Sequence, residues 1–573
     1  MNWRHNVMVG LFVAGTAWLG WHVIALSLAL PYSDPEFLRR EGDKRSIRTE
    51  EISAQRGVIR DRWGEPLAVS TPAYNVFVDP SVKVPDENRW AELAALTGLN
   101  VADFPGRFAD RDRGYVLLKR RVNWEEMQQI KAAKIAGVNF GTVYRRYYPA
   151  GEVAAHVVGA AGFVEAASEE VGREGVEVSF DDHLRASAGR KLVLRDRRGE
   201  NVRVLQYLAA PKVGKDLTLS IDLRLQYVAY RELKAAVAGH NAAAGTAVVL
   251  DVETGDILAL VNTPSYNPNS GIPAGAHGVR NIAVTDKIEP GSTAKVFAAM
   301  AGIETGRYSP DSMFHTAPGY ITVRGKTVKD PLNYGDLSLR GVLAKSSQVG
   351  IIKLALDLER DAVYKSLVRA GFGEPVGSGL PREYSGRLSP DGLRSDLVRI
   401  NFAYGYGFNG SALQLARAYL TLARSGNKPP VSIVRSEGPV AGEQVFDPMH
   451  ARTVVQMLEA VTETGGTAHI AAVPGYRIAG KTGTARVLTD GQYDDKKHVA
   501  LFAGIAPISD PKLVTVIVIW HPARGVSGGG AVAAPVFARI AERSLRLLGI
   551  PGDAPPPMTA TTVALADAGR NPT

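Results

Sequence analysis

A single long apolar stretch lies near the amino end of the chain. Residues 7–30 carry no formal charge, whereas Arg4 lies just before them. At about 1.5 Å per residue, a helix of this length would span ~36 Å, which is enough to cross a bilayer. We predict a cytoplasmic stub and transmembrane anchor over 1–30, and the positive-inside rule places the remainder outside the cytoplasm. A cleaved signal peptide is the alternative, although signal cores usually have only about 7 to 15 residues.

The next part of the chain has a mixed pattern. Residues 31–51 are rich in charge and predict a solvated linker. Over 52–215, short strand-like runs alternate with amphipathic stretches such as 90–96 and 124–136, which favours an irregular α+β domain. The basic stretch over 185–203 is interrupted by acidic residues, so a solvated hairpin is favoured over a polyanion site.

A second and larger domain is expected over 216–550. Its pattern begins with a long amphipathic helix over 223–238 and a strand–turn–strand over 245–261. The final stretch, 551–573, is rich in Pro, Ala and Thr and predicts a disordered tail. No internal repeat is evident.

Composition narrows the chemistry. The 573 residues suffice for two or three domains, and 45% of them are hydrophobic. The absence of Cys excludes disulfides, thiolate metal sites and a thiolate nucleophile. A net charge of +9 over this length is far below that of a nucleic-acid binder, so no nucleic-acid partner is expected. No metal or organic cofactor is indicated either.

Without Cys, a covalent enzyme needs another nucleophile, and a serine can be activated by a lysine one helical turn later. The spacing Ser-x-x-Lys occurs at Ser292/Lys295, Ser425/Lys428 and Ser509/Lys512. Prolines lie inside or directly after the last two, which predicts turns. Ser292 instead precedes an uninterrupted helical pattern, where backbone N–H groups can serve a developing oxyanion.

A second rare motif follows later in the chain. Lys481-Thr-Gly-Thr484 continues a strand-like run, and its glycine removes side-chain bulk so that a substrate backbone can approach closely. A Lys-Thr-Gly triplet is expected only about 0.1 times by chance in such a chain. The two motifs in this order are therefore specific.

The pattern resembles serine acyl-transferases that bind penicillin, which combine Ser-x-x-Lys, Ser-x-Asn and Lys-Thr-Gly. Over about residues 50–550 the chain is similar to class B penicillin-binding proteins, and most to their division-specific FtsI group, often called penicillin-binding protein 3. Further matching segments are Arg56–Arg62, Tyr148–Glu152 with His156, Gly175–Glu177, Pro264–Pro268, Phe402–Gly407, and Gly529–Gly530 with Ala533–Pro535.

The resemblance implies a multidomain fold. It consists of a single N-terminal transmembrane helix, an α+β pedestal of the penicillin-binding protein dimerisation type, and an α/β penicillin-binding transpeptidase domain. The last should have a mixed β-sheet flanked by helices, plus a helical subdomain, with a cleft between Ser292, Ser346 and Lys481.

One position departs from the family pattern. The middle motif corresponds to Ser346-Ser-Gln348, with Gln in place of Asn. Two literal Ser-x-Asn matches occur elsewhere. Ser265-Tyr-Asn267 lies before the nucleophile, and Ser425-Gly-Asn427 lies in a predicted turn, so neither is assigned as the middle motif. Gln keeps the amide's donors and acceptor but adds a methylene, so Gln348 could still hold Lys295 and the substrate amide at altered geometry. A decayed motif is the alternative.

By the same resemblance, Ser292 attacks the penultimate D-alanine carbonyl of a peptidoglycan stem peptide and forms an acyl-enzyme. Lys295 is the base, and both burial and nearby Lys481 would lower its pKa. Ser346 relays the proton to the leaving amine, while Gln348 orients the substrate amide.

The Lys481 strand is expected to bind the rest of the substrate. By the same resemblance, Lys481, Thr482 and Thr484 bind the terminal carboxylate, Gly483 is a further substrate-binding position, and the backbone N–H groups of Ser292 and Thr484 form the oxyanion hole. The substrate would lie along this strand as an added strand.

These residues imply a D,D-transpeptidase that cross-links septal peptidoglycan and is acylated by β-lactams at Ser292. Because no polymerase domain is present, we expect an FtsW-type membrane glycosyltransferase and other division proteins as partners, in the bacterial cytoplasmic (inner) membrane with a periplasmic catalytic domain. The alternatives are a conditional paralog and a catalytically weakened division scaffold or sensor. A β-lactamase is disfavoured, because a Glu-x-x-Leu-Asn segment is absent.

Overall fold

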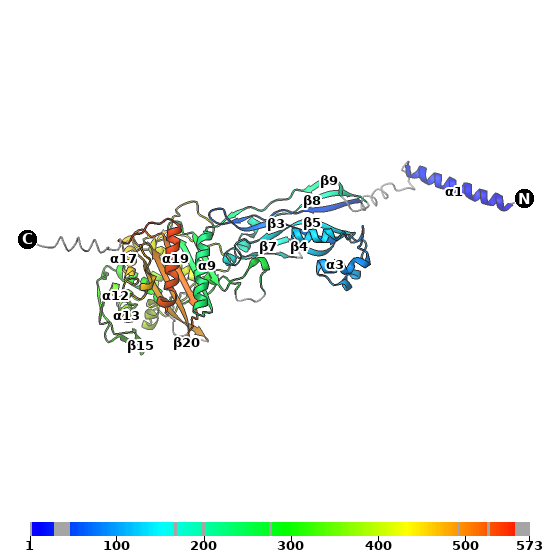
Figure 1. Ribbon diagram of the computed structural model, residues 1–573. Helices are drawn as coiled ribbons and strands as arrows, with labels where there is room; N and C mark the ends of the chain where they lie inside the picture. Colours follow the sequence, from blue (N-terminus) through cyan, green and yellow to red (C-terminus); the bar gives the residue numbers. More distant parts are fainter. Residues whose placement is uncertain are drawn as a thin grey trace, which may run out of the picture. The chain divides into compact units, whose positions relative to one another are not determined.

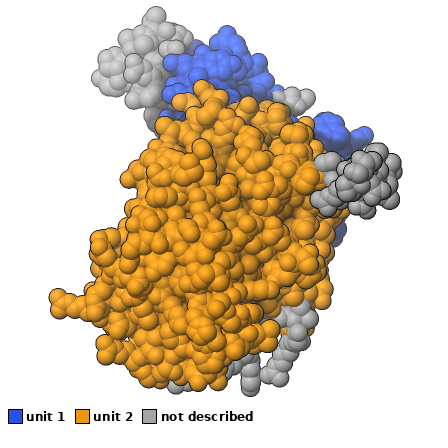
Figure 2. Space-filling model, turned by 90° about the vertical axis from the view of Figure 1, so that its left-hand side faces the viewer, with its two compact units in different colours: residues 1–57, 70–146, 186–214 blue, residues 58–69, 147–185, 215–573 orange. Residues whose placement is uncertain are grey.

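The computed structural model describes residues 3–27, 46–164, 169–196, 201–273, 278–489, 492–523 and 528–555 (Figure 1). The chain divides into two compact units that interleave along the sequence (Figure 2). Unit 1 is Met1–Gly57, Ser70–Arg146 and Ala186–Gly214, and unit 2 is Val58–Val69, Tyr147–Arg185 and Lys215–Thr573. The consecutive domains expected from the sequence, with a boundary at 215/216, stay a prediction. Most of the expected linker and tail, 31–45 and 556–573, lies outside the described residues.

The apolar stretch forms helix α1, Trp3–Ser27. Within the described part of the chain it is the one helix long and apolar enough to cross a membrane, over Trp3–Ile24, and none of that window is buried against protein. Large exposed apolar side chains such as Phe12 and Trp18 are compatible with lipid as their surroundings. Residues 28–30 of the predicted span lie outside the described residues.

Unit 1 contains a three-stranded antiparallel sheet of β1 (Ile47–Ile52), β8 (Gly189–Arg195) and β9 (Asn201–Ala209), in the order β1-β8-β9. The hairpin predicted for the basic stretch is confirmed by the β8–β9 pairing. Residues 47–51, expected to be linker, pair with β8 instead. Their charges are accommodated across the strands, since Lys191 Nζ lies 3.3 Å from Glu50 Oε2.

The other part of unit 1 is a small α+β core, as the sequence pattern predicts. The elements are β3 (Pro66–Val78, of which the start belongs to unit 2), β4 (Val116–Val122), β5 (Val138–Tyr147), η1 (Glu87–Arg89), α3 (Trp90–Thr97), η2 (Val101–Asp103), α4 (Phe104–Arg107) and α5 (Trp124–Ala132). Leu93, Phe104 and Ile130 bury the helices' apolar sides in one cluster. A capping box between Asn123 and Glu126 begins α5.

Unit 2 is built on a five-stranded sheet in the order β12-β11-β21-β20-β19. The strands are β11 (Ala244–Asp251), β12 (Ile257–Thr263), β19 (Ala479–Thr489), β20 (Gln492–Ala506) and β21 (Leu513–Trp520). All four pairings are antiparallel, so the expected mixed sheet is wrong. The pairs β11–β12, β19–β20 and β20–β21 are each joined by a short connection. Parallel neighbours would need crossovers of a dozen or more residues.

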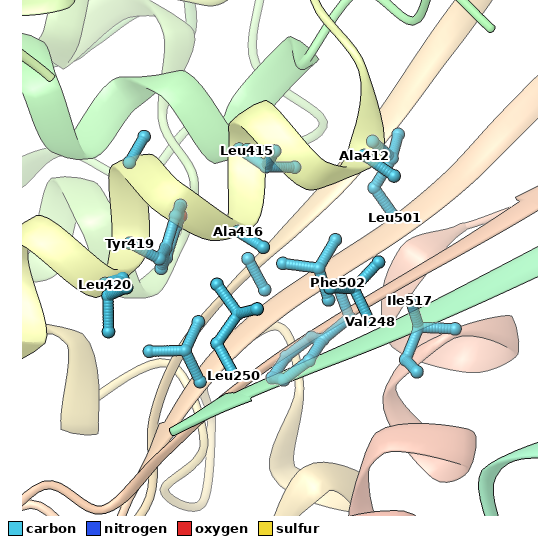
Figure 3. Close-up of a cluster of buried hydrophobic side chains, with 14 of the residues drawn as sticks. Val248, Leu250, Ala412, Leu415, Ala416, Tyr419, Leu420, Leu501, Phe502 and Ile517 are labelled. Atoms are coloured by element: carbon cyan, nitrogen blue, oxygen red, sulfur yellow. The ribbon is translucent and has the colours of Figure 1, made fainter. Parts of the chain in front are cut away.

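Helices cover both faces of this sheet. On one face α9 (Leu223–Gly239) packs beside α19 (Ala534–Leu547). The ring of Phe537 in α19 packs, tilted by 53°, against the ring of Phe502 in β20, with 4.7 Å between their centroids. On the other face lies α16 (Ala412–Ala423), all of whose residues are buried. Figure 3 shows Ala412 of α16 beside Leu501 of the sheet. The sheet is thus enclosed, and β19 remains at its edge.

The helical part of unit 2 lies around α11 (Lys295–Glu304), which is buried from Lys295 to Ile303. Its other main elements are α10 (Ile282–Thr285), η6 (Gly291–Ala294), α12 (Leu339–Ala344), α13 (Gln348–Asp357), α14 (Ala362–Arg369), α15 (Asp396–Ala403) and α17 (Pro448–Glu459). The short strands β13 (Met313–His315), β14 (Tyr320–Val323), β15 (Lys326–Lys329) and β16 (Asp336–Ser338) form two hairpin-like pairs.

Smaller elements complete unit 2. They are β2 (Ile59–Arg60), η3 (Gly151–Val153), α6 (Ala155–Val158), β6 (Ala160–Val164), β7 (Glu169–Glu174), α7 (Gly175–Ser179), α8 (Asp181–Leu184), β10 (Leu217–Thr218), η5 (Pro268–Ser270), β17 (Asn427–Lys428), β18 (Glu443–Gln444), η7 (His469–Ala471) and α18 (Gly529–Val532).

Candidate active site

Ser292 lies half-buried on the 3₁₀ turn η6, directly before α11. The turn is held by Gly291, whose φ is 53° and whose N–H donates to Gly405 O at 3.0 Å. A side chain at Gly405 would lie 1.9 Å from Gly291 O, so only glycine permits this approach. The other two candidates occupy irregular backbone, as predicted: Ser425 is in a turn with φ 54°, and Ser509 is in a bend.

Lys295 is fully buried and bonded to the middle motif. Its Nζ donates to Ser346 O at 2.5 Å and to Ser346 Oγ at 3.2 Å. Burial lowers the pKa of Lys295 to about 7, although the Asp330 carboxylate opposes this shift. A large fraction of the amine is therefore neutral near pH 7 and able to accept a proton.

Ser346 occupies a strained turn between α12 and α13. Its φ is 57°, in the left-handed region that non-glycine residues seldom adopt, and its N–H donates to Leu343 O at 3.2 Å. The next residue, Ser347, caps α13 by accepting the N–H of Gly350 at 3.0 Å. The turn thus presents Ser346 to Lys295.

Gln348 is the first residue of α13 and is half-buried. Its Nε2 donates to Lys329 O, at the end of β15, at 3.0 Å. This bond accounts for one donor of the amide and leaves the other donor and the carbonyl oxygen for a substrate. The expected role of Gln348 toward Lys295 and the substrate amide stays a prediction.

Lys481 lies on edge strand β19 and is also fully buried. Its Nζ lies 3.4 Å from Thr482 O. Burial, followed by the charge of Lys295, lowers the pKa of Lys481 well below its usual value. The repulsion between the two lysines thus lowers the pKa of Lys481, whereas the lowered pKa of Lys295, expected to come partly from Lys481, is caused by burial. An anionic group entering the site would restore the ammonium form.

The residues after Lys481 contact the segments around Thr467 and Gly529 and the turn that carries Ser292. Thr482 Oγ1 lies 3.1 Å from Thr467 Oγ1, and Thr484 Oγ1 accepts the N–H of Gly529 at 3.2 Å. A Cβ on Gly483 would lie 3.0 Å from Thr293 Cγ2 and 3.1 Å from Pro290 O. The glycine thus makes room for the nucleophile turn itself rather than for a substrate backbone.

Three contributors to the site were missed by sequence reasoning. Tyr406 Oη lies 3.4 Å from Thr484 O, Asp330 bonds the Ser346 turn, and Thr467 contacts Thr482. Tyr406 lies in a segment that carries the family resemblance, which was a usable signal. Asp330 and Thr467 lie in no recognised motif, and no spacing in the sequence points to them.

In the described ranges no cluster of three or more His, Asp or Glu side chains could hold a metal ion. The site is instead a serine with two buried lysines of lowered pKa, an arrangement suited to acyl transfer.

Comparison with protein families agrees with this chemistry. Residues 245–542 match the penicillin-binding protein transpeptidase domain, and residues 51–219 match the penicillin-binding protein dimerisation domain. The chain belongs to the class B penicillin-binding proteins. It thus combines the transpeptidase fold and dimerisation-type pedestal expected from its motifs with a single candidate membrane helix.

Relatives cover nearly the whole chain. The chain is 40% identical over 97% of its length to the peptidoglycan D,D-transpeptidase FtsI of Escherichia coli K12, covering 93% of that protein. It is 36% identical over 96% of its length to the probable peptidoglycan D,D-transpeptidase PbpC of Pseudomonas aeruginosa, covering 96% of it.

Solved structures are similar as well. Penicillin-binding protein 3 of Mycobacterium tuberculosis, complexed with aztreonam, matches 89% of this chain and 100% of that one, with a TM-score of 0.65 and 28% identity. The transpeptidase domain of penicillin-binding protein 3 from Burkholderia pseudomallei matches 59% of this chain and 98% of its own, with a TM-score of 0.54 and 37% identity.

Proposed function

We propose that this class B penicillin-binding protein is a serine-type peptidoglycan D,D-transpeptidase that cross-links stem peptides at the division septum. The observation that carries the proposal is the Lys295 amine, which is buried one helical turn after Ser292 and bonded to Ser346. The 40% identity to an FtsI enzyme over 97% of the chain supports both the reaction and the division role.

In the acylation step, neutral Lys295 accepts the Ser292 hydroxyl proton as Oγ attacks the penultimate D-alanine carbonyl. The tetrahedral intermediate collapses, the bond to the terminal D-alanine breaks, and Ser346 passes the proton to the leaving amine. Its contact with Lys295 Nζ supports this relay. Gln348 orients the substrate amide with its side-chain carbonyl oxygen and with the amide N–H that is not bonded to Lys329 O.

The same step requires groups that hold the substrate's ends. Lys481, Thr482 and Thr484 bind the terminal carboxylate, and the backbone N–H groups of Ser292 and Thr484 stabilise the oxyanion. The Thr484 carbonyl points toward Tyr406. In an antiparallel strand the N–H and C=O of one residue point to the same side, so the Thr484 N–H is directed to that side as well. This supports a substrate that lies along the edge of β19.

In the second step, an amine of a neighbouring strand attacks the acyl-enzyme and forms the cross-link. Water in its place would give the carboxypeptidase product, which is the hydrolase side reaction of the same intermediate. A β-lactam acylates Ser292 in the same way, because its strained amide occupies the position of the D-alanyl amide.

We infer a single-pass protein of the bacterial cytoplasmic (inner) membrane with a periplasmic catalytic domain. Arg4, in the first turn of α1 and ahead of its uncharged stretch, supports this orientation. Residues 31–46 then serve as linker, the strand residues 47–51 join 52–215 in the pedestal, 216–550 form the transpeptidase domain, and 551–573 form the tail. Cross-linking needs new glycan, so an FtsW-type glycosyltransferase and other division proteins are the proposed partners.

The function is tested by exposing membranes that carry wild type or Ser292→Ala to a fluorescent penicillin and following the adduct. Long-lived labelling that is lost in Ser292→Ala supports the transpeptidase. Rapid turnover of the antibiotic would identify a β-lactamase. A folded wild type that refuses every β-lactam would favour the scaffold. Complementation of a cell depleted of its main division transpeptidase separates the housekeeping enzyme from a conditional paralog.

A further inference from the structure

A buried carboxylate lies behind the turn that carries Ser346. Asp330 follows β15 directly and is 8% exposed. Its Oδ1 accepts the N–H of Gln348 at 2.5 Å and the N–H of Val349 at 3.2 Å, while its Oδ2 accepts the Ser347 hydroxyl at 2.5 Å. Both oxygens are therefore bonded to a single turn, although Asp330 is 16 residues from Ser346 in sequence.

These bonds fix the backbone on the carboxyl side of Ser346. The left-handed conformation at Ser346 is strained for a non-glycine residue and persists only where its surroundings hold it. Asp330 anchors the first N–H groups of α13, where a negative charge is also favoured by the helix dipole. Ser347 donates to Asp330 while it accepts from Gly350, so its hydroxyl cannot rotate freely.

The same carboxylate acts on Lys295 through space. Its charge favours the ammonium form of Lys295 and opposes the effect of burial, while Lys295 in turn faces Lys481. On the neighbouring side Tyr334 faces Asp330, and burial with that negative charge raises the pKa of the Tyr334 phenol. Lys295 thus interacts electrostatically with one negative and one positive group.

Other charged side chains on the helices that pack against α11 are bonded to partners of their own. In the described part of the chain these include Lys353 of α13 to His315 O at 2.6 Å, Asp357 of α13 to Arg307 at 3.1 Å, Arg340 of α12 to Glu463 at 3.6 Å, Arg369 of α14 to Glu304 at 2.5 Å, Lys365 of α14 to Asp361 at 2.8 Å, Arg399 of α15 to Asp396 at 3.1 Å, and, on α17, Glu459 to Arg477 at 2.7 Å, Arg452 to Ser425 at 3.0 Å and His450 to Asp447 at 3.9 Å. Asp330 is thus the negative group that acts on the Lys295 ammonium.

We infer that Asp330 is a positioning residue for acylation: its carboxylate holds the Ser346 turn against Lys295, and its charge sets how readily Lys295 releases its proton. The role rests on the proposed function of this site. It has two separable parts, one geometric and one electrostatic, and different substitutions remove each part.

Asp330→Asn is the electrostatic test, because Asn has nearly the same shape and keeps one acceptor oxygen. Without the negative charge the ammonium form of Lys295 is less favoured, so neutral amine appears at lower pH. We expect the acidic limb of the penicillin acylation rate to move to lower pH. Loss of one hydrogen-bond acceptor should also lower the plateau, which is the acylation rate at high pH where it no longer changes with pH.

Ser347→Ala is the geometric test. It removes the hydroxyl that joins Asp330 to Gly350 but leaves the charge in place. Here the plateau rate should fall by about 10- to 100-fold, the scale of a small misplacement of a reacting group, while the acidic limb stays where it is. Asp336→Asn is the matched control, because that exposed carboxylate bonds His315 and should change neither quantity.

The measurements use the full-length protein in membranes, with folding of each variant checked by thermal unfolding. If the acidic limb of the acylation rate lies at the same pH in Asp330→Asn as in wild type, the electrostatic part of the inference is overturned. If the plateau acylation rate of Ser347→Ala equals that of wild type, the geometric part is overturned. Should Asp330→Asn not fold, Ser347→Ala still decides the geometric part, and Asp330→Ser, which also removes the charge, decides the other by the position of its acidic limb. A folded wild type without any acylation removes the proposed function itself.

Discussion

The Lys295 ammonium nitrogen lies 2.5 Å from the carbonyl oxygen of Ser346 and 3.2 Å from its hydroxyl oxygen. Ser346 can present both atoms to one amine because its backbone is in the left-handed region. The amine is therefore held by the middle motif before any substrate arrives, and its remaining lone pair or proton is available to Ser292.

Replacing Lys295 by Arg should abolish the base while retaining a cation. A guanidinium keeps its proton at all accessible pH values, so the Ser292 proton has no acceptor. We expect the acylation rate to fall by about 10²- to 10⁴-fold, the usual contribution of a general base. Stopped-flow or gel-based labelling with a fluorescent penicillin measures it. Lys428→Arg, in the second Ser-x-x-Lys motif, should label like wild type, and equal labelling of both variants would refute the assignment.

The pH dependence of acylation follows from the same amine. Its pKa lies near 7, so the neutral fraction rises as pH increases through this value. We expect the wild-type acylation rate to climb through about pH 7 and to level off above it. A rate profile that is flat from pH 5 to 9 would show that Lys295 does not titrate in the reaction.

Lys481→Met should make the protein more stable and inactive. Burial and the neighbouring Lys295 both disfavour the Lys481 ammonium, and methionine fills a similar volume without a charge. A gain of about 1–2 kcal/mol is expected at pH 7, within the ordinary range for single substitutions. Thermal unfolding measures the gain and penicillin labelling the loss.

The pH dependence of the stability gained by Lys481→Met gives a further check. In the folded wild type Lys481 has a lowered pKa, so the unfolded chain binds more protons between that pKa and about 10.5, the normal value. Wild-type stability therefore rises with pH in this window, and the advantage of Lys481→Met should shrink as pH is raised toward 10. Lys512→Met, at an exposed pair with Asp510, should show neither the gain nor this trend.

Gln348→Asn should release the side chain from β15. Asn is one methylene shorter and cannot maintain the 3.0 Å bond to Lys329 O without moving the helix. Its amide then faces the cleft, as in the family pattern, and we expect penicillin acylation to become severalfold faster. Gln444→Asn removes a methylene from an amide that bonds Ser425 and Phe446 instead, and is the control. Slower acylation of Gln348→Asn would mean that the longer side chain is itself required.

Gly483→Ala should displace the nucleophile turn. The new Cβ would press on Thr293 and Pro290, whose closest atoms lie 3.0 and 3.1 Å from its position. We expect a loss of about 1–3 kcal/mol in stability, as for other overpacked sites, together with slower acylation. Gly239→Ala, in open space at the end of α9, should be neutral or slightly stabilising. Wild-type kinetics in Gly483→Ala would contradict the proposed close approach.

Sequence reasoning reached those parts of the site that depend on local spacing. Ser292 and Lys295 are one turn apart, and Lys481 lies on a strand, so their motifs could be recognised and their elements predicted. Asp330 could not be found in this way, because its link to Ser346 arises only when β15 packs beside the turn before α13.

The fold shows the same division between local and long-range information. The helix at Trp124, the hairpin in the basic stretch and the membrane helix follow from periodicity and charge. The strand at 47–51 did not, because its charges are satisfied by residues of β8 that are distant in sequence. Strand direction in the main sheet was likewise missed, since it depends on which neighbours pair.

The interleaving of the two units has a consequence for how the protein is made. Leu223 N–H, at the start of α9, donates to Asp61 Oδ2 at 3.2 Å, and Leu217 of β10 pairs with Ile59 of β2. A ribosome releases residues 58–69 some 150 residues before these partners. The early segment can pair within itself, as Ile59 does with Ala68, but its bonds to Leu217 and Leu223 form only after the intervening chain has been synthesised.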